Sequence, residues 1–98
     1  MTTIEDIKKA ITPIASELGL KRVILFGSYA RGEQTKDSDI DLIIDSEETL
    51  RGLQVFGAIY KISEVLPVKA DIFELYEIIK PSQTYDAIMQ EGVLVYER

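Results

Sequence analysis

Two aspartates at the beginning of an apolar run, Asp39 and Asp41, are the residues of this sequence best suited to chemistry. The run that follows them, Leu42-Ile43-Ile44, predicts a buried strand, in which residues i and i+2 point to the same face. The two carboxylates would then lie close together, where each disfavours the ionisation of the other. A divalent cation between them would remove that repulsion, so the pair is a candidate metal site. Taken alone, the pair is also compatible with a solvated acidic turn that leads into the strand.

A glycine and a serine, Gly27 and Ser28, follow a second apolar run, Arg22-Val23-Ile24-Leu25-Phe26. Glycine lets the backbone approach a phosphate closely, and a helical turn after the strand would present free N–H groups and the positive end of its dipole. The Ser28 hydroxyl adds another hydrogen-bond donor. This junction is therefore a candidate phosphate site, although the dipeptide by itself is also compatible with a simple turn.

A third aspartate, Asp71, lies between Ala70 and Ile72 in an apolar segment, where a charge is out of place without a partner. If its strand pairs beside the strand that begins at Asp39, three carboxylates meet on one rim of the sheet. Three carboxylates beside a phosphate-binding turn predict two-metal phosphoryl transfer. One metal would activate the attacking hydroxyl, and the other would hold the triphosphate and the leaving pyrophosphate.

The composition narrows the chemistry further, because histidine and cysteine are both absent. Their absence excludes Ser-His-Asp triads, Cys-His pairs, disulfides and ordinary zinc sites. A catalytic metal would be held by oxygen ligands, which favour Mg²⁺, Mn²⁺ or Ca²⁺. The lack of cysteine also fits a cytoplasmic protein.

The charge balance restricts the possible partners. The chain has 98 residues and a formal net charge of −6, which argues against direct binding of nucleic acid, since such domains are usually basic. A nucleotide held through bound cations remains compatible with it. The length predicts one domain over residues 1–98, and no apolar run approaches the roughly 20 residues that cross a bilayer. We expect a soluble protein without membrane contact.

Two other motifs fit these residues less well. The spacing of Gly27 and Gly32 matches a P-loop, but Glu33-Gln34 stand where Lys and Ser or Thr are required. Acidic residues from Asp37 to Glu48 match EF-hand loop positions, but Leu42 replaces the required glycine and the flanks do not read as two helices.

The elements that must position these residues alternate between helix and strand, which predicts an α/β fold with either a mixed or a parallel sheet. We expect Pro13 to kink or break the first helix, and Gly19 and Gly92 to end helices. The predicted helices cover residues 3–18, 28–32 (one turn), 47–65 and 82–90, and the predicted strands cover 22–26, 39–45, 68–73 and 93–96. The apolar stripe expected for the 47–65 helix runs through Leu50, Leu53, Phe56, Ile59 or Tyr60, and Ser63.

Two motifs together, Gly27-Ser28-Tyr29-Ala30-Arg31-Gly32 and Ser38-Asp39-Ile40-Asp41-Leu42, resemble the signature of the DNA polymerase β-like nucleotidyltransferase superfamily. The short chain and the Gly-Ser-x-x-Arg-Gly form are similar to the minimal nucleotidyltransferases, the MntA-like antitoxins that pair with HEPN-domain toxins. The resemblance implies a small mixed sheet of about four strands flanked by helices, and Mg²⁺–ATP as substrate.

The resemblance also implies roles for individual residues. Gly27 and Ser28 would bind the triphosphate, Asp39 and Asp41 would bind metal, and Asp71 would complete the carboxylate set and help to deprotonate the acceptor. Arg31 matches the arginine of the family, where a phosphate contact and a salt bridge within the helix are both open. Mg²⁺, with Mn²⁺ as an alternative and two ions expected, would be the cofactor.

The acceptor is not encoded in these motifs, because fold-level analogy does not select it. Relatives of this size imply transfer of AMP, or of another nucleoside monophosphate, to a tyrosine of a partner HEPN toxin. The other hypothesis is an antitoxin that neutralises its partner by contact, without chemistry. The presence of all three carboxylates favours the enzyme.

Overall fold

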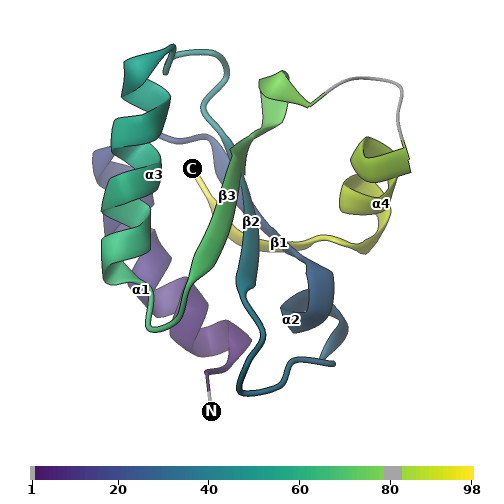
Figure 1. The fold of residues 1–98 in the computed structure, drawn as a ribbon. Helices are drawn as coiled ribbons and strands as arrows, with labels where there is room; N and C mark the ends of the chain where they lie inside the picture. The colour runs from purple at the N-terminus through teal and green to yellow at the C-terminus, as the bar shows by residue number, and fades with distance from the viewer. Residues whose placement is uncertain (1, 79–82) are drawn as a thin grey trace.

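A sheet of four strands forms the centre of the computed structural model, which describes residues 2–78 and 83–98 (Figure 1). The elements are α1 (Ile4–Glu17), β1 (Arg22–Phe26), α2 (Gly27–Arg31), β2 (Ile40–Asp45), α3 (Leu53–Val65), β3 (Ala70–Glu74), the short 3₁₀ helix η1 (Leu75–Glu77), α4 (Gln83–Glu91) and β4 (Val93–Glu97). The strand order is β3-β2-β1-β4. β1 pairs antiparallel with β2 and β4, whereas β2 and β3 are parallel. The sheet is mixed, which confirms the expected fold.

Different helices cover the two faces of the sheet. In Figure 1, α1 and α3 lie on one face and α4 lies on the other, while α2 follows directly on the end of β1. Side chains alternate along β2, so that Leu42 and Ile44 join the larger core with α1 and α3, and Ile43 joins a smaller cluster with Ile88 of α4. Asp41 shares the face of Ile43, so the sheet presents this carboxylate on the α4 side.

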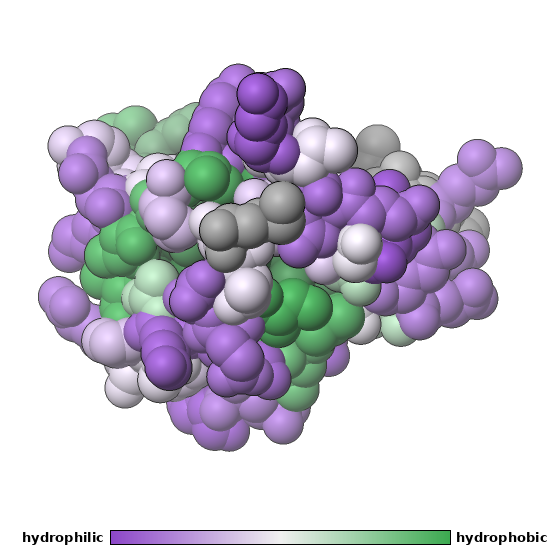
Figure 2. All heavy atoms as spheres, turned by 90° about the horizontal axis from the view of Figure 1, so that it is seen from below, coloured by the Kyte–Doolittle hydropathy of each residue, from purple (hydrophilic) through white to green (hydrophobic). Residues whose placement is uncertain are grey.

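The surface is mixed in polarity. Seen from the end that carries the N-terminus and α2, hydrophilic side chains predominate and hydrophobic ones show in separate patches (Figure 2). Among residues 2–78 and 83–98, no helix has the length and hydropathy needed to cross a membrane.

The first helix is continuous from Ile4 to Glu17, so it does not break at Pro13, and a kink there stays a prediction. Thr3 and Asp6 form a capping box, in which each side chain accepts a hydrogen bond from the backbone N–H of the other, at 3.1 and 2.9 Å. Ile11 and Ala15, on either side of Pro13, are fully buried against the sheet. This packing offsets the one helical hydrogen bond that proline cannot donate. Gly19 follows the helix with φ of +69°, as expected for its C-terminal glycine.

The third helix begins at Leu53, six residues later than expected. Residues 46–52 form turns instead, because Glu47 and Glu48 adopt positive φ values of 54° and 63°. The Asp45 carboxylate accepts the Glu47 N–H at 3.0 Å and fixes the first of these turns. Such side-chain bonds to the local backbone compete with helix formation.

The buried face of this helix also differs from the expected stripe. Val55, Ala58 and Ile62 face the core, whereas Leu53 is 85% exposed and Phe56 is 69% exposed. The helix is apolar over more than one face, so periodicity alone could not select the side that packs against the sheet.

The other boundaries lie within two residues of those expected. β1 is as predicted, β2 begins one residue later, β3 begins two residues later, and β4 extends one residue further. The Gly92 N–H donates to the Ile88 oxygen at 2.9 Å where α4 ends. The expected start of that helix at Ser82, after Pro81, lies outside the described residues.

Glu74, at the end of β3, is a charged residue that lies buried in this fold. Its side chain is 1% exposed and accepts hydrogen bonds from the Ser46 hydroxyl and from the Leu75 N–H, the latter at 2.8 Å. Burial raises the pKa of Glu74 above the ordinary 4.5, and these hydrogen bonds oppose the rise in part.

We expect Glu74→Gln to stabilise the protein increasingly as the pH rises. A carboxyl whose pKa is higher in the folded than in the unfolded chain favours folding while protonated, and that contribution is lost as the pH rises through the folded pKa. The glutamine oxygen can still accept the Leu75 N–H, and its amide can donate to Ser46. Urea unfolding of both proteins at about pH 4 and about pH 8 measures the effect. An equal stability difference at both pH values would contradict this account of Glu74.

Candidate active site

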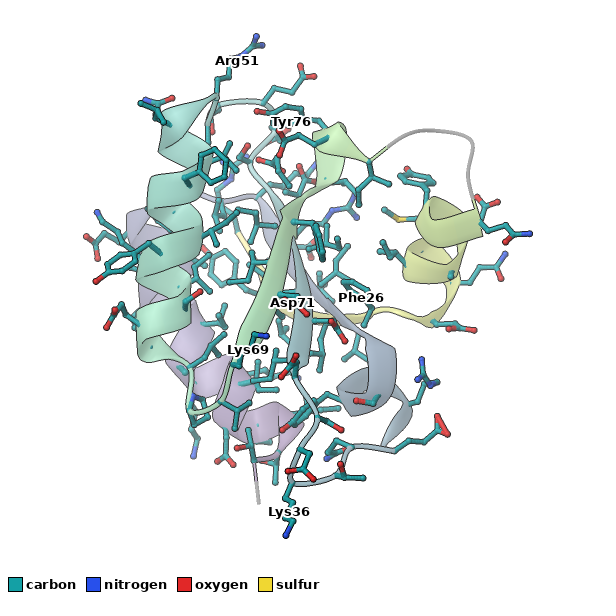
Figure 3. The ribbon with its side chains drawn as sticks, in the orientation of Figure 1. Phe26, Lys36, Arg51, Lys69, Asp71 and Tyr76 are labelled. Atoms are coloured by element: carbon teal, nitrogen blue, oxygen red, sulfur yellow. The ribbon has the colours of Figure 1, made fainter. Side chains whose placement is uncertain are left out.

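Asp41 stands in the middle of a row of three paired residues that crosses the sheet. Its register partners are Phe26 on β1 and Asp71 on β3. Residues paired directly across neighbouring strands share a face, with their Cα atoms about 5 Å apart. Figure 3 shows Asp71 near the start of β3, with Phe26 beyond it toward α4. The structure thus brings two of the three predicted carboxylates together.

The electrostatics of this row depend on Asp41. It is half-buried, and its pKa is raised above the ordinary 3.8. Burial is the largest cause, repulsion from Asp71 and then from Asp39 adds to it, and the positive charge of Arg31 opposes it. Asp71 and Asp39 therefore each lie within electrostatic reach of Asp41, and a cation beside Asp41 would relieve the repulsion.

Asp39, the third carboxylate, precedes β2 and has a different partner. Its Oδ2 lies 3.8 Å from the Nζ of Lys69. The Lys69 carbonyl accepts the Ile40 N–H at 2.9 Å, which joins the start of β3 to the start of β2. Sequence reasoning did not include Lys69 in the site, although its position two residues before Asp71 was the available signal (Figure 3).

Gly27 brings the phosphate-site candidate against the carboxylates. It begins α2 with φ of +74°, a conformation that side chains other than glycine's rarely adopt. A Cβ on Gly27 would overlap the Oδ2 atom of Asp41. Two features thus require glycine at this position: the positive φ of its backbone and the lack of space for a Cβ beside the Asp41 carboxylate. Ser28, the next residue, is partly exposed in the first turn of α2.

Arg31, at the other end of α2, has a salt bridge within the structure. Its Nε lies 2.6 Å from the Glu33 carboxylate, and both side chains are half or more exposed. Arg31 also lowers the pKa of Asp41 and borders a pocket of about 290 Å³ with Gly27 and Glu91. Glu33 lies after the end of α2, so this salt bridge is not within the helix, and a phosphate contact of Arg31 stays a prediction.

An apolar pocket opens beside Asp41 on the α4 face. This aspartate pocket has a volume of about 310 Å³ and is lined by Phe26, Asp41, Ile43, Phe73, Ile78 and Ile88. Its apolar residues were not predicted as part of the site. For Phe73 a signal existed, because it follows Asp71 by two residues in one strand and so shares its face. For Ile78 and Ile88 none existed, since Ile78 lies outside the predicted helices and strands and Ile88 reaches the pocket from α4.

The carboxylates fit a hard divalent cation by their chemistry. They are oxygen donors, and the pKa of Asp41 is raised first by burial and then by repulsion from Asp71 and Asp39, which a cation would offset. As the side chains lie, no three acidic groups of the described residues converge closely enough to form a complete metal site. Asp39 would have to turn from Lys69 to join the other two. The residues present are therefore suited to the ion but are not already arranged around it.

Sequence comparison defines the class of protein to which this fold and site belong. A family model described as a nucleotidyltransferase domain matches residues 7–95. The chain belongs to this nucleotidyltransferase family. A protein of Methanocaldococcus jannaschii, provisionally named a protein adenylyltransferase, is 39% identical over 90 residues, which are 92% of this chain and 95% of that protein. The family expected from the two motifs is thereby confirmed.

Solved structures share the fold. A crystal structure of a toxin–antitoxin with AMP-PNP has a TM-score of 0.73 at 22% identity, covering 93% of this chain and 73% of the other. A second structure holds a tri-AMPylated Shewanella oneidensis HEPN toxin in complex with an MNT antitoxin. It has a TM-score of 0.68 at 18% identity and covers 98% of this chain and 74% of the other.

Proposed function

We propose that this protein transfers AMP from ATP to a tyrosine hydroxyl of a partner HEPN toxin and thereby acts as its antitoxin. One observation carries the proposal: Asp41 and Asp71 are paired across β2 and β3, and Gly27 contacts Asp41 at the start of α2. Carboxylates beside a phosphate-binding turn suit nucleotidyl transfer. The protein adenylyltransferase name of the relative and the AMPylated toxin of the similar complex support AMP as the group and a protein as the acceptor. ATP as donor is consistent with a cytoplasmic protein.

The proposed step breaks a phosphoanhydride bond of ATP and forms a phosphate ester bond to the acceptor. The acceptor oxygen attacks the α-phosphorus of ATP, the bond from that phosphorus to the bridging oxygen breaks, and pyrophosphate leaves. Gly27 and Ser28 would hold the triphosphate. The proton of the hydroxyl would pass to Asp71, which is more exposed than Asp39 or Asp41 and so is accessible to an acceptor arriving from solution.

Asp39, Asp41 and Asp71 would hold Mg²⁺ or Mn²⁺, expected as two ions, for this step. Bound there, the metal would neutralise charge on the triphosphate and lower the pKa of the attacking hydroxyl. The oxygen-only donor set is the reason for proposing these ions.

The alternative is neutralisation by contact, and it predicts a different behaviour of Asp39→Asn. We expect Asp39→Asn to bind the partner but to leave its tyrosine unmodified and its toxicity intact. A surface substitution at a half-exposed aspartate leaves the fold in place. Co-expression with the toxin, followed by mass spectrometry of the toxin, measures both effects. If Asp39→Asn neutralises the toxin as well as the parent protein does, contact is the better account.

A further inference from the structure

An apolar stripe on the outer side of α3 is largely exposed to solvent. Leu53, Phe56 and Tyr60 follow one another at helical spacing and are 85%, 69% and 65% exposed. Large apolar side chains that are grouped on a protein surface often mark an interaction site, whereas single exposed apolar side chains usually do not.

Beside this stripe lies a groove along the outer edge of β3, here termed the β3 groove. It has a volume of about 300 Å³, with Phe56 and Ile59 of α3 on one side and Phe73 and Ile78 on the other. β3 is a terminal strand of the sheet. Its outer backbone groups therefore face the groove and not another strand.

The β3 groove is continuous with the active site. Phe73 and Ile78 line both the β3 groove and the aspartate pocket that contains Asp41. Phe73 is 50% exposed and follows Asp71 by two residues in one strand. A protein that covers the stripe and the β3 groove would thus extend to the carboxylates without a gap.

The charges around this surface identify the kind of protein that would bind. Glu77 lines the β3 groove, and Glu64 accepts a hydrogen bond from the Tyr60 hydroxyl at the stripe. Two of the nearby cations are engaged, since Lys69 faces Asp39 at 3.8 Å and Arg51 faces Glu48 at 4.0 Å. A second copy of this chain would also carry a net charge of −6, so its acidic groups would be repelled by those of this surface. The surface fits apolar side chains that are surrounded by Lys and Arg.

We propose that the α3 stripe and the β3 groove are the docking surface for the acceptor protein, which presents an apolar patch with a basic rim. This inference rests on the proposed function. Docking there brings the acceptor hydroxyl to Asp71 through the shared wall of Phe73 and Ile78. The surface would supply affinity for the acceptor and leave ATP binding to the opposite side of the aspartate row.

The test compares Leu53→Lys and Phe56→Lys with Val65→Lys, a matched control. Val65 is also an exposed apolar residue of α3, 41% exposed, but lies off the stripe. The measurements are binding of the purified partner HEPN toxin as acceptor, KM and kcat for AMP transfer to it, calorimetric binding of Mg²⁺–ATP, and melting temperature. We expect acceptor binding to weaken by at least about thirtyfold for Phe56→Lys, as at an interface hot spot. KM should rise by a similar factor, while ATP binding is unchanged.

Val65→Lys should bind the acceptor within about twofold of the parent, a change typical of a residue outside an interface. Two results would overturn the docking surface: parent-like acceptor binding by both stripe variants, or equal weakening by Val65→Lys. Failure of the proposed function gives another pattern, in which the parent itself transfers no AMP to the acceptor. Dimers of the parent that the stripe variants dissociate would assign the surface to self-association instead.

Discussion

Replacing Asp41 by asparagine should abolish AMP transfer while leaving the melting temperature unchanged or higher. Asparagine has nearly the same shape but lacks the charge that would bind the metal. We expect a loss of at least about a thousandfold, since metal ions supply several kcal/mol of transition-state stabilisation. Burial and the repulsion from Asp71 and Asp39 raise the pKa of Asp41, so the ionised form opposes folding and its removal relieves that strain as the pH rises.

Asp37→Asn is the control for this substitution, because Asp37 is an exposed acidic residue of the loop that precedes β2 and lies outside the row of paired residues. It should keep full transfer. The measurements are the rate of AMP transfer from labelled ATP and the melting temperature, for the parent, Asp41→Asn and Asp37→Asn. Transfer by Asp41→Asn at more than a few per cent of the parent rate would show that Asp41 is not a catalytic group.

The second large effect is expected from Gly27→Ala, which should lose both ATP binding and transfer. The new Cβ would overlap the Asp41 carboxylate and displace it from the row. The positive φ of Gly27 adds backbone strain of about 1–3 kcal/mol in a residue with a side chain. Calorimetry with ATP, in Mg²⁺ and in EDTA, should show magnesium-dependent binding for the parent and little binding for the variant.

Gly19→Ala is the control that separates the effect of backbone strain from the effect of displacing the Asp41 carboxylate. Gly19 has nearly the same φ, +69°, but a Cβ there meets nothing within 4 Å. This variant should lose a comparable amount of stability and yet bind Mg²⁺–ATP like the parent. If Gly27→Ala binds Mg²⁺–ATP with the affinity of the parent, the close contact between Gly27 and Asp41 is not required for nucleotide binding.

The strands were predictable because each is a short apolar run bounded by polar residues or glycine. β1 is the clearest case, since Arg22–Phe26 is buried in its middle and ends at Gly27. What the sequence could not establish was the strand order, because the pairing of β2 with β3 depends on how the chain between them packs. That pairing is what sets Asp71 beside Asp41.

The incorrect predictions from sequence concern segments in which tertiary packing overrides the local preference for secondary structure. Pro13 is tolerated within α1 because the helix is buried on both sides of it. The turns at residues 46–52 depend on the Asp45 side chain and on positive φ at Glu47 and Glu48, which ordinary propensities do not anticipate. Phe56 was expected inside and lies outside.

The candidate site likewise contains residues that the sequence could predict and contacts that it could not. Asp39, Asp41, Gly27 and Ser28 were recognisable because they adjoin in sequence the strands that carry them. The salt bridges of Asp39 with Lys69 and of Arg31 with Glu33 are side-chain geometry, which spacing alone does not determine. The aspartate pocket combines β1, β2, β3 and α4, so its walls exist only in the folded chain.

The most direct test of nucleotidyl transfer follows two phosphates of ATP separately. The parent protein and the purified acceptor protein are incubated with Mg²⁺ and ATP labelled either at the α-phosphate or at the γ-phosphate. We predict that the α label becomes bound to the acceptor and that the γ label appears in pyrophosphate, because the bond that breaks lies between the α-phosphorus and its bridging oxygen. Gamma label on the acceptor, or no label from either ATP, would contradict the assignment of this chain as an AMP-transferring enzyme.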